Sequence, residues 1–150
     1  MPEETLFVFR DLWFHTGDVL RRDADGFLYF VGRRKDIVRR RGENISAAEV
    51  EMVIETHPDV LECAVVGVPS EMTEEEVLAC VVLRSDAKLE PGLLLDFCVT
   101  KMARFMVPRY LRFMPVLPKT PTDKVEKFRL QQEFGRAQKW DGEKSAWVAG

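Results

Sequence analysis

The sequence is poor in the features that mark secreted, metal-binding and membrane-spanning chains. Its three cysteines, Cys63, Cys80 and Cys98, are odd in number, widely spaced and without a C-x-x-C pair. That pattern indicates neither a disulfide framework nor a zinc site, and it fits a reducing cytosol best. No apolar run approaches the ~20 residues that cross a bilayer, and acidic Glu3 and Glu4 do not resemble the start of a signal peptide. We therefore expect a soluble, cytoplasmic chain with no metal site and no membrane span.

An overall excess of positive charge is also missing. The formal net charge is -3, whereas a dedicated nucleic-acid binder usually carries a basic balance, so nucleic acid is not an expected partner. The hydrophobic share of 46% and the charged share of 31% are ordinary for a globular chain. With 150 residues and no internal repeat or low-complexity stretch, we expect one domain, or one domain with a piece of another.

Positive charge is instead concentrated between residues 32 and 51. Six cations occupy nine positions there: Arg33, Arg34, Lys35, Arg39, Arg40 and Arg41. Such density points to an anionic partner, although composition alone favours a solvated basic hairpin, or a targeting or nucleic-acid patch. Gly42 follows, where the missing Cβ allows a positive φ or a close approach to a ligand. This glycine is therefore either the tip of a hairpin or a contact.

Turn and cap signals divide the first half of the chain into short elements. Residues 23–26, Asp-Ala-Asp-Gly, predict a turn between two strands, of which the second covers residues 27–31. Ser46 and Glu49 form a capping-box pattern that begins a helix, and Pro58 ends it. The expected apolar stripe of this helix is Ala47, Val50, Val53 and Ile54. These signals predict a β-hairpin followed by a helix.

The second half reads as strands alternating with helices. Strands are expected over residues 60–69, 77–83 and 110–116, and the first is apolar on both faces, which predicts a central position in its sheet. One helix is expected to begin at Pro91 and a last one near Val125. From Arg136 the chain turns polar, and we expect a loosely held tail. The order predicts an α+β fold, a small mixed β-sheet with packed helices preceded by a β-hairpin.

Three motifs in this order resemble the adenylate-forming acyl-CoA synthetases. Residues 32–51 resemble the hinge and the first C-terminal-domain motif of that family, and residues 13–18 and 118–124 resemble the motifs on either side. The residues of the motifs at 13–18 and 32–51 are most similar to those of ligases of the crotonobetaine or carnitine type. The resemblance implies that residues 1–34 end a large N-terminal domain, that 35–135 form the mobile C-terminal domain, and that 136–150 are a polar tail.

The resemblance also implies a reaction in two steps. Synthetases of this family join a carboxylic acid to ATP, which gives an acyl-adenylate and pyrophosphate, and then use coenzyme A to displace AMP as a thioester. The small C-terminal domain rotates between the steps. ATP with Mg²⁺ would be bound mainly by the N-terminal domain of the same enzyme, since no Ser/Thr/Gly-rich phosphate loop occurs in these residues. We expect a fragment without a complete catalytic cycle, and we leave its oligomeric state open.

The family's nucleotide-side residues can be placed on this sequence. Asp18 matches the aspartate that accepts hydrogen bonds from both ribose hydroxyls of ATP, and Arg33 matches the arginine near the ribose and phosphates. Lys35 matches the hinge position. Lys124 matches the catalytic lysine of adenylation, whose compact charge suits the α-phosphate. The family usually has glycine before that lysine, where this chain has Asp123.

Three further residues match the side of the family's domain that meets coenzyme A. Gly42 matches a glycine along the pantetheine arm, although the preceding residue is Arg41 and not a second glycine. Phe105 is placed to stack on the adenine, and Arg109 to pair with a phosphate. A core phenylalanine and a surface arginine are equally good interpretations of the last two residues.

Two other functions fit the sequence less well. One is an adenylation domain that transfers its acyl group to a carrier-protein thiol. The other is a non-enzymatic module that uses the basic cluster to bind nucleic acid or an acidic partner. The sequence favours the C-terminal part of an acyl-CoA synthetase, acting on a small carboxylic acid.

Overall fold

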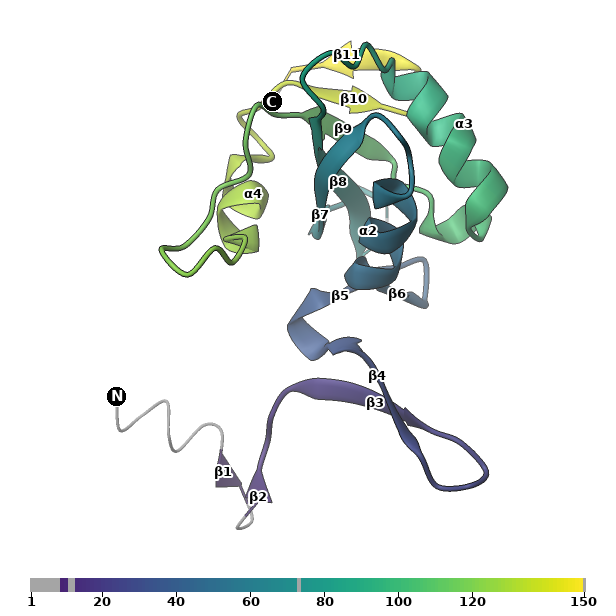
Figure 1. Cartoon of the computed structure of the whole chain (residues 1–150), viewed down its shortest axis with the longest axis vertical. Coiled ribbons are helices and arrows are strands. Elements are labelled where there is room, and N and C mark those ends of the chain that lie inside the picture. The colour runs from purple at the N-terminus through teal and green to yellow at the C-terminus, as the bar shows by residue number, and fades with distance from the viewer. Residues whose placement is uncertain (1–8, 11–12, 73, 150) are drawn as a thin grey trace.

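The computed structural model describes residues 9–10, 13–72 and 74–149, and it divides into an extended part and a compact part (Figure 1). The extended part holds the antiparallel pairs β1 (Phe9–Arg10) with β2 (Trp13–Phe14) and β3 (Asp18–Arg22) with β4 (Leu28–Arg33). A 3-10 helix, η1 (Arg34–Asp36), leads from β4 into the compact part. The β-hairpin expected around residues 23–26 is confirmed, with the Asp23 carboxylate accepting hydrogen bonds from the backbone of Asp25 and Phe27.

The compact part is built on one mixed sheet of five strands in the order β11-β10-β9-β8-β7. Its strands are β7 (Val60–Pro69), β8 (Glu75–Leu83), β9 (Tyr110–Phe113), β10 (Lys139–Asp141) and β11 (Ala146–Val148). Strands β8 and β9 run parallel, and the other neighbours run antiparallel. The helices are α2 (Ala47–Glu55), α3 (Pro91–Lys101) and α4 (Lys127–Glu133), and a short hairpin of β5 (Ile37–Arg40) and β6 (Glu43–Ser46) precedes them. The predicted α+β fold with a small mixed sheet is confirmed.

Alternation along the sheet strands creates two cores. Successive side chains of a strand point to opposite faces, so Val65 of β7 packs in one buried cluster and Val66 in the other. The first cluster gathers buried residues of α2 and α3, and the second gathers Leu130 of α4. The sheet is therefore covered on both faces, by α2 and α3 on one side and α4 on the other (Figure 1).

The first helix begins where the sequence predicted. The Ser46 hydroxyl accepts a hydrogen bond from the backbone N–H of Glu49 at 3.4 Å, which satisfies one of the free donors at the start of α2. Ala47, Val50 and Ile54 of the expected stripe are buried, and Val53 is half-buried. The helix is thus fixed against β7 by its apolar face.

The central position predicted for the strand at residues 60–69 is wrong. Strand β7 is apolar on both faces, but it lies at the end of the sheet. Its unpaired backbone edge is satisfied by side chains: Glu55 and Glu51 of α2 accept from the amides of Cys63 and Val65 at 3.2 and 2.7 Å, and Gln131 donates to the carbonyl of Gly67. Strand β7 is apolar throughout because helices cover both faces of the sheet. The polar contacts along its edge replace the hydrogen bonds of a neighbouring strand.

The loosely held tail expected after Arg136 is also wrong. Strands β10 and β11 form a hairpin that extends the sheet beyond β9, with Trp140 opposite Leu111 of β9. The rings of Trp140 and Trp147 meet edge to face, with centroids 5.7 Å apart. Lys139 is buried and donates to the backbone carbonyls of Phe134 and Ala149. A polar composition hid this hairpin, which we call the C-terminal hairpin, because two of its charged side chains, Lys139 and Asp141, are buried against carbonyl groups or an arginine.

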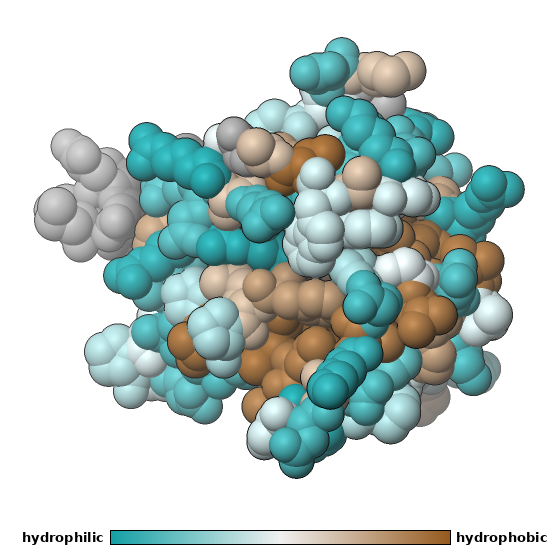
Figure 2. Space-filling view, turned by 90° about the horizontal axis from the view of Figure 1, so that it is seen from above, coloured by the Kyte–Doolittle hydropathy of each residue, from teal (hydrophilic) through white to brown (hydrophobic). Residues whose placement is uncertain are grey.

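Some apolar side chains remain on the surface. Figure 2 views the molecule from above the compact part and shows hydrophobic residues gathered in one area, with hydrophilic residues around them. On the β3–β4 hairpin, Leu20, Leu28 and Phe30 are 50%, 63% and 63% exposed.

No helix in the described part of the chain is long and apolar enough to cross a bilayer.

Leu130 is fully buried in the cluster under α4, whereas Phe128 of the same helix is 52% exposed. We expect Leu130→Ala to lower the free energy of unfolding by about 2–5 kcal/mol, because it leaves a cavity that the packed sheet cannot close. Phe128→Ala is the control and should cost less than about 1 kcal/mol. Urea unfolding of both variants measures the difference, and equal losses would show that α4 packs by another face.

Candidate functional site

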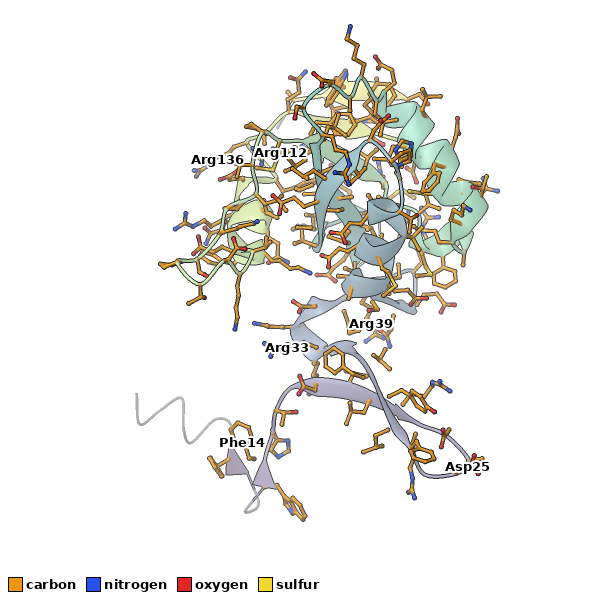
Figure 3. The ribbon with its side chains drawn as sticks, viewed as in Figure 1. Phe14, Asp25, Arg33, Arg39, Arg112 and Arg136 are labelled. Carbon is orange, nitrogen blue, oxygen red and sulfur yellow. The ribbon has the colours of Figure 1, made fainter. Side chains whose placement is uncertain are left out.

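A pocket of about 480 Å³ lies where the hinge region, β7 and the loop before α4 meet. It is lined by Arg33, Lys35 and Lys124, three of the residues that the sequence analysis selected from distant positions. We call it the lysine-loop pocket. Figure 3 shows Arg33 at the junction between the extended and compact parts. The structure therefore brings the predicted hinge residue, the predicted adenylation lysine and one nucleotide-side arginine to one cavity.

The loop that carries Lys124 is closed by its own backbone. Thr120 donates its amide to the carbonyl of Lys124 at 2.8 Å, and its hydroxyl accepts from the Lys124 amide at 3.2 Å. Asp123 has φ of 61°, a left-handed conformation that favours glycine. This torsion supplies the physical reason why a glycine suits the position before the lysine.

The Lys124 ammonium group has no carboxylate partner within the part of the chain that the structure describes. The neighbouring Asp123 carboxylate points elsewhere, to Lys119 at 3.4 Å. Lys119 is also bound to Glu62 at 2.8 Å, and the hydrogen bond to Glu62 raises the pKa of Lys119. The charge of Lys124 is thus available to a ligand in the pocket.

Asp18 lies beside Arg33 and is partly engaged by it. The two residues are opposite each other in the β3–β4 register, and the Asp18 carboxylate is 3.5 Å from Nε of Arg33. The backbone of Arg34 donates to the carbonyl of Gly17 at 2.7 Å, which ties η1 to the start of β3. Both predicted nucleotide-side residues therefore lie on the extended part, Asp18 at the start of β3 and Arg33 at the end of β4, next to the predicted hinge.

Gly42 forms the tip of the β5–β6 hairpin. Arg41 and Gly42 have φ of 53° and 82°, and Arg40 pairs with Glu43 across them. A two-residue turn with both central residues in the left-handed region matches the twist of a hairpin. Apart from its two chain neighbours, no heavy atom of the described residues lies within 4 Å of the position a Cβ would take at Gly42, so this backbone is open to an approaching molecule.

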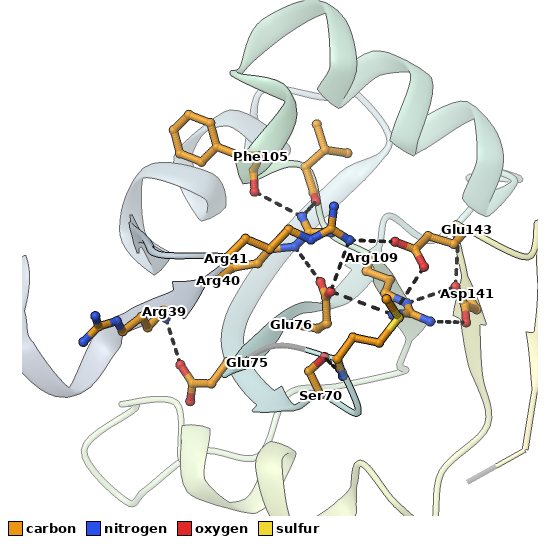
Figure 4. Close-up of polar contacts among 12 residues, drawn as sticks. Arg39, Arg40, Arg41, Ser70, Glu75, Glu76, Phe105, Arg109, Asp141 and Glu143 are labelled. Carbon is orange, nitrogen blue, oxygen red and sulfur yellow. Dashed lines mark hydrogen bonds and ion pairs between the residues drawn. The ribbon is translucent and has the colours of Figure 1, made fainter.

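A buried ion pair lies beside this turn (Figure 4). Nε of Arg40 is 2.6 Å from a carboxylate oxygen of Glu76, and the two side chains are 9% and 1% exposed. The guanidinium group also donates to the carbonyls of Phe105 and Val107, at 3.1 and 2.9 Å. Burial lowers the pKa of Arg40, and the charge of Glu76 opposes that effect.

Arg109 is surrounded by carboxylates from two strands and a turn. It lies 3.8 Å from Glu76, 3.4 Å from Asp141 and 3.3 Å from Glu143. Burial by itself lowers the pKa of Arg109, but the hydrogen bond to Asp141 and the nearby charges outweigh burial and raise it. The interpretation of Arg109 as a surface arginine is wrong, because its side chain is only 15% exposed. Its pairing with a ligand phosphate stays a prediction.

These arginines border a second pocket, of about 900 Å³, which shares no lining residue with the first. We call it the arginine pocket; Arg41, Arg104, Phe105, Arg109, Trp140 and Glu143 are among the residues that line it. Phe105 is 44% exposed, so the core phenylalanine of the alternative interpretation is wrong as well. The structure thus places Phe105 and Arg109 together, with Arg41, the neighbour of Gly42, at the same cavity.

Sequence reasoning missed the three carboxylates of this cluster. Glu76 precedes the strand predicted over residues 77–83, but it lies in β8 and is 1% exposed. Asp141 and Glu143 were assigned to a loose tail. The available signals were a glutamate directly before an apolar strand and the alternation Lys-Trp-Asp before a Gly-Glu turn. Within the described ranges, no group of three acidic, histidine or cysteine side chains is arranged to hold a metal ion.

Fold and site together define a class of protein: a small α+β domain that follows a short 3-10 helix, with a lysine loop at one pocket and a basic turn at another. The sequence from residue 49 to residue 124 matches the AMP-binding enzyme C-terminal domain. The chain belongs to this family, which the three motifs indicated.

Similar proteins include acyl-CoA ligases. The mitochondrial medium-chain acyl-CoA ligase ACSF2 of Bos taurus is 40% identical over 125 residues, which cover 83% of this chain and 20% of that protein. The crotonobetaine/carnitine–CoA ligase of Shigella dysenteriae serotype 1 is 40% identical over 121 residues, 81% of this chain and 23% of that protein. The structure of ATP-bound MatB from Rhodopseudomonas palustris matches with a TM-score of 0.80 and 35% identity, over 89% of this chain and 27% of that chain. The chain thus spans about a fifth to a quarter of the length of these relatives.

The buried ion pair supports a test of stability. We expect Glu76→Ala to lower the free energy of unfolding by about 3–5 kcal/mol, because it leaves the Arg40 guanidinium buried without a counter-charge. Glu74→Ala, which removes an exposed partner of Arg39 at 3.8 Å, should cost only about 0–1 kcal/mol. Chemical unfolding of the two variants provides the comparison. A loss for Glu76→Ala no larger than for Glu74→Ala would contradict the buried pair.

Proposed function

We propose that this chain is the C-terminal part of an ATP-dependent acyl-CoA synthetase, which converts a carboxylic acid, ATP and coenzyme A into an acyl-CoA, AMP and pyrophosphate. Membership of the AMP-binding enzyme C-terminal domain family and the similarity to acyl-CoA ligases support this proposal. One structural observation carries it furthest. The lysine-loop pocket combines Arg33, which precedes Lys35, with Lys124, which follows it.

In the adenylation step, Lys124 is the catalytic residue. Its ammonium group is a compact charge on a closed loop, suited to stabilise negative charge on the α-phosphate while the carboxylate attacks. Asp18 accepts hydrogen bonds from the ribose hydroxyls, and Arg33 binds near the ribose and phosphates. Lys124 and Arg33 line the same pocket, and Lys124 has no carboxylate partner among the described residues, which supports their roles; Asp18 does not line this pocket, and its position 3.5 Å from Arg33 supports its role.

In the thioester step, the domain turns about Lys35 and presents the arginine pocket. Gly42 lies along the pantetheine arm, where its open backbone leaves room, and Phe105 stacks on the adenine. Arg109 meets a phosphate of coenzyme A. The exposure of Phe105 and the place of Arg109 at the same cavity support this assignment.

ATP carries Mg²⁺ in the proposed reaction, but the described residues do not fit a site for that ion. They contain no cluster of acidic, histidine or cysteine side chains arranged for a metal, and Lys124 and Arg33 are cations. We assign Mg²⁺ and most of the ATP contacts to the N-terminal domain of the same enzyme, and we derive no step through the metal.

We propose that residues 1–34 are the end of that N-terminal domain and that the rest of the domain covers the β3–β4 hairpin. The exposed apolar side chains Leu20, Leu28 and Phe30 on the β3–β4 hairpin support a covering partner, because a two-stranded hairpin cannot bury its own apolar face. Residues 35–135 are the proposed mobile domain. The C-terminal hairpin moves with them, since it belongs to the same sheet.

The acid substrate is proposed as a small carboxylic acid of the crotonobetaine or carnitine kind. The ligase of Shigella dysenteriae serotype 1 supports that choice, while ACSF2 of Bos taurus is named for medium-chain acids. A cytosolic location stays a prediction from the cysteine pattern, and ACSF2 is named as a mitochondrial protein.

Lys124→Ala tests the adenylation role in the full-length enzyme. We expect acyl-adenylate formation, measured by pyrophosphate exchange, to fall about 100- to 1,000-fold, because preorganised charge at the reacting phosphate is lost. Thioester formation from pre-made acyl-adenylate and coenzyme A should be nearly unchanged, since Lys124 has then moved away. Asp123→Gly is the matched control and should leave adenylation equal or faster, because glycine fits the left-handed backbone. Equal slowing of both half-reactions by Lys124→Ala would show that the lysine only supports the fold.

Lys35→Pro tests the hinge in the same enzyme. Proline fixes φ, so one half-reaction should stay close to normal while the other collapses. Lys35→Ala removes the charge but keeps the torsional freedom, and it should preserve both half-reactions. Wild-type rates for both half-reactions of Lys35→Pro would exclude Lys35 as the pivot.

A further inference from the structure

Glu143 occupies an unusual place at the mouth of the arginine pocket. It lies in the turn of the C-terminal hairpin, and one of its carboxylate oxygens is 3.1 Å from Arg41 while the other is 3.3 Å from Arg109. Figure 4 shows this carboxylate between the two guanidinium groups, which come from segments far apart in the sequence. A single side chain thus bridges two cations that otherwise face the cavity.

The other two carboxylates of this cluster cannot leave it easily. Glu76 and Asp141 are each 1% exposed, and each neutralises a buried or nearly buried arginine. Glu143 is 47% exposed, and the backbone holds it through its amide, which donates to Asp141 at 3.0 Å. Its side chain can therefore turn into water without leaving a buried charge uncompensated, because Arg109 keeps Glu76 and Asp141 as partners.

The position of Glu143 is suited to an anion. Guanidinium groups bind carboxylates and phosphates with the same planar fork, so a carboxylate between two arginines marks where a phosphate oxygen would bind. Phe105 lies at the same cavity with 44% of its surface exposed, which offers a face for a nucleobase. The pocket therefore combines an aromatic surface with an anion position that the protein itself occupies.

We propose that Glu143 is a displaceable internal substitute for a phosphate of the nucleotide end of coenzyme A. In the empty pocket it keeps Arg41 and Arg109 ordered and neutralised. When coenzyme A binds, a phosphate takes its place and the Glu143 side chain turns into solvent. Glu143 thereby sets the affinity of the pocket, and this role rests on the proposed function, in which coenzyme A binds beside Phe105.

Glu143→Gln in the full-length enzyme tests this proposal, because it keeps the shape of the side chain and removes the competing charge. We expect the KM for coenzyme A in the thioester half-reaction to fall about three- to tenfold, with kcat little changed, since the ion pairs of Glu143 with Arg41 and Arg109 are no longer lost on binding. Pyrophosphate exchange should stay at the wild-type rate. An unchanged or higher KM would overturn the proposal.

Glu133→Gln is the matched control. Glu133 is 48% exposed and pairs with Arg112 at 2.8 Å, so it resembles Glu143 in exposure and bonding, but it does not line the arginine pocket. Its KM for coenzyme A should equal that of the wild type. A fall in KM as large as that of Glu143→Gln would show a general charge effect and overturn the specific role of Glu143.

Two further measurements distinguish a failure of the proposed role of Glu143 from a failure of the proposed function. Dephospho-coenzyme A lacks the 3′-phosphate. If Glu143→Gln lowers the KM for coenzyme A alone, Glu143 occupies the position of the 3′-phosphate. If it lowers the KM for both ligands equally, Glu143 occupies the position of the diphosphate. Phe105→Ala should raise the KM for coenzyme A if the adenine stacks there. No effect of Phe105→Ala refutes the proposed coenzyme A site itself, whereas a raised KM together with an inert Glu143→Gln refutes only the role of Glu143.

Discussion

The arrangement of the compact part depends on the buried ion pair between Arg40 and Glu76. Two charges taken out of water are costly unless each finds a partner, so β5 and β8 must meet where these side chains lie. Among the described residues, the β5–β6 hairpin shares no backbone ladder with the five-stranded sheet. The hairpin is held by Val38 and Ile45, which are buried in the first core cluster, and by the Arg40–Glu76 pair at its turn end. The hydrogen bonds from Arg40 to the carbonyls of Phe105 and Val107 extend this attachment to the segment before β9.

This attachment changes the meaning of the basic cluster in the sequence. Its density suggested an external anion, but three of its arginines already face carboxylates of the same chain: Arg39 faces Glu74, Arg40 faces Glu76, and Arg41 faces Glu143. A module for nucleic acid needs cations free to release counterions from phosphates. The structure thus weakens the nucleic-acid interpretation for the second half of the cluster, and it leaves the first half, around Arg33 and Lys35, at the lysine-loop pocket.

Local signals predicted most of the fold, and long-range pairing explains the failures. The cap at Ser46, the turn at residues 23–26 and the apolar strands depend on neighbours in sequence, and the structure has them as expected. The edge position of β7 depends on Glu51, Glu55 and Gln131, whose contacts with it no sequence window reveals. The C-terminal hairpin was missed for the same reason, because its burial follows from partners about 30 to 100 residues away, among them Arg109 and Arg41.

The candidate site was predictable residue by residue but not as a geometry. The motifs selected Arg33, Lys35 and Lys124, and one pocket collects them; they also selected Phe105 and Arg109, which share another. The motifs could not reveal that Arg109 has carboxylate partners or that Lys124 has none within the described residues. The first fact depends on Asp141 and Glu143, which lie outside the three motifs. The second depends on Asp123, which stands where the family usually has glycine and pairs with Lys119.

The two pockets differ in their position relative to Lys35, the hinge that we propose, and this difference fits the proposed two-step reaction. Residues on both sides of Lys35 in the sequence line the lysine-loop pocket, so the proposed rotation about Lys35 would move Lys124 away from Arg33. The residues that line the arginine pocket all follow Lys35, from Arg40 onward, and the Arg40–Glu76 pair joins β5 to β8, so the same rotation would carry this pocket intact. One movement would thus open the first site and bring the second to the adenylate, as successive adenylation and thioester formation at a single adenylate require.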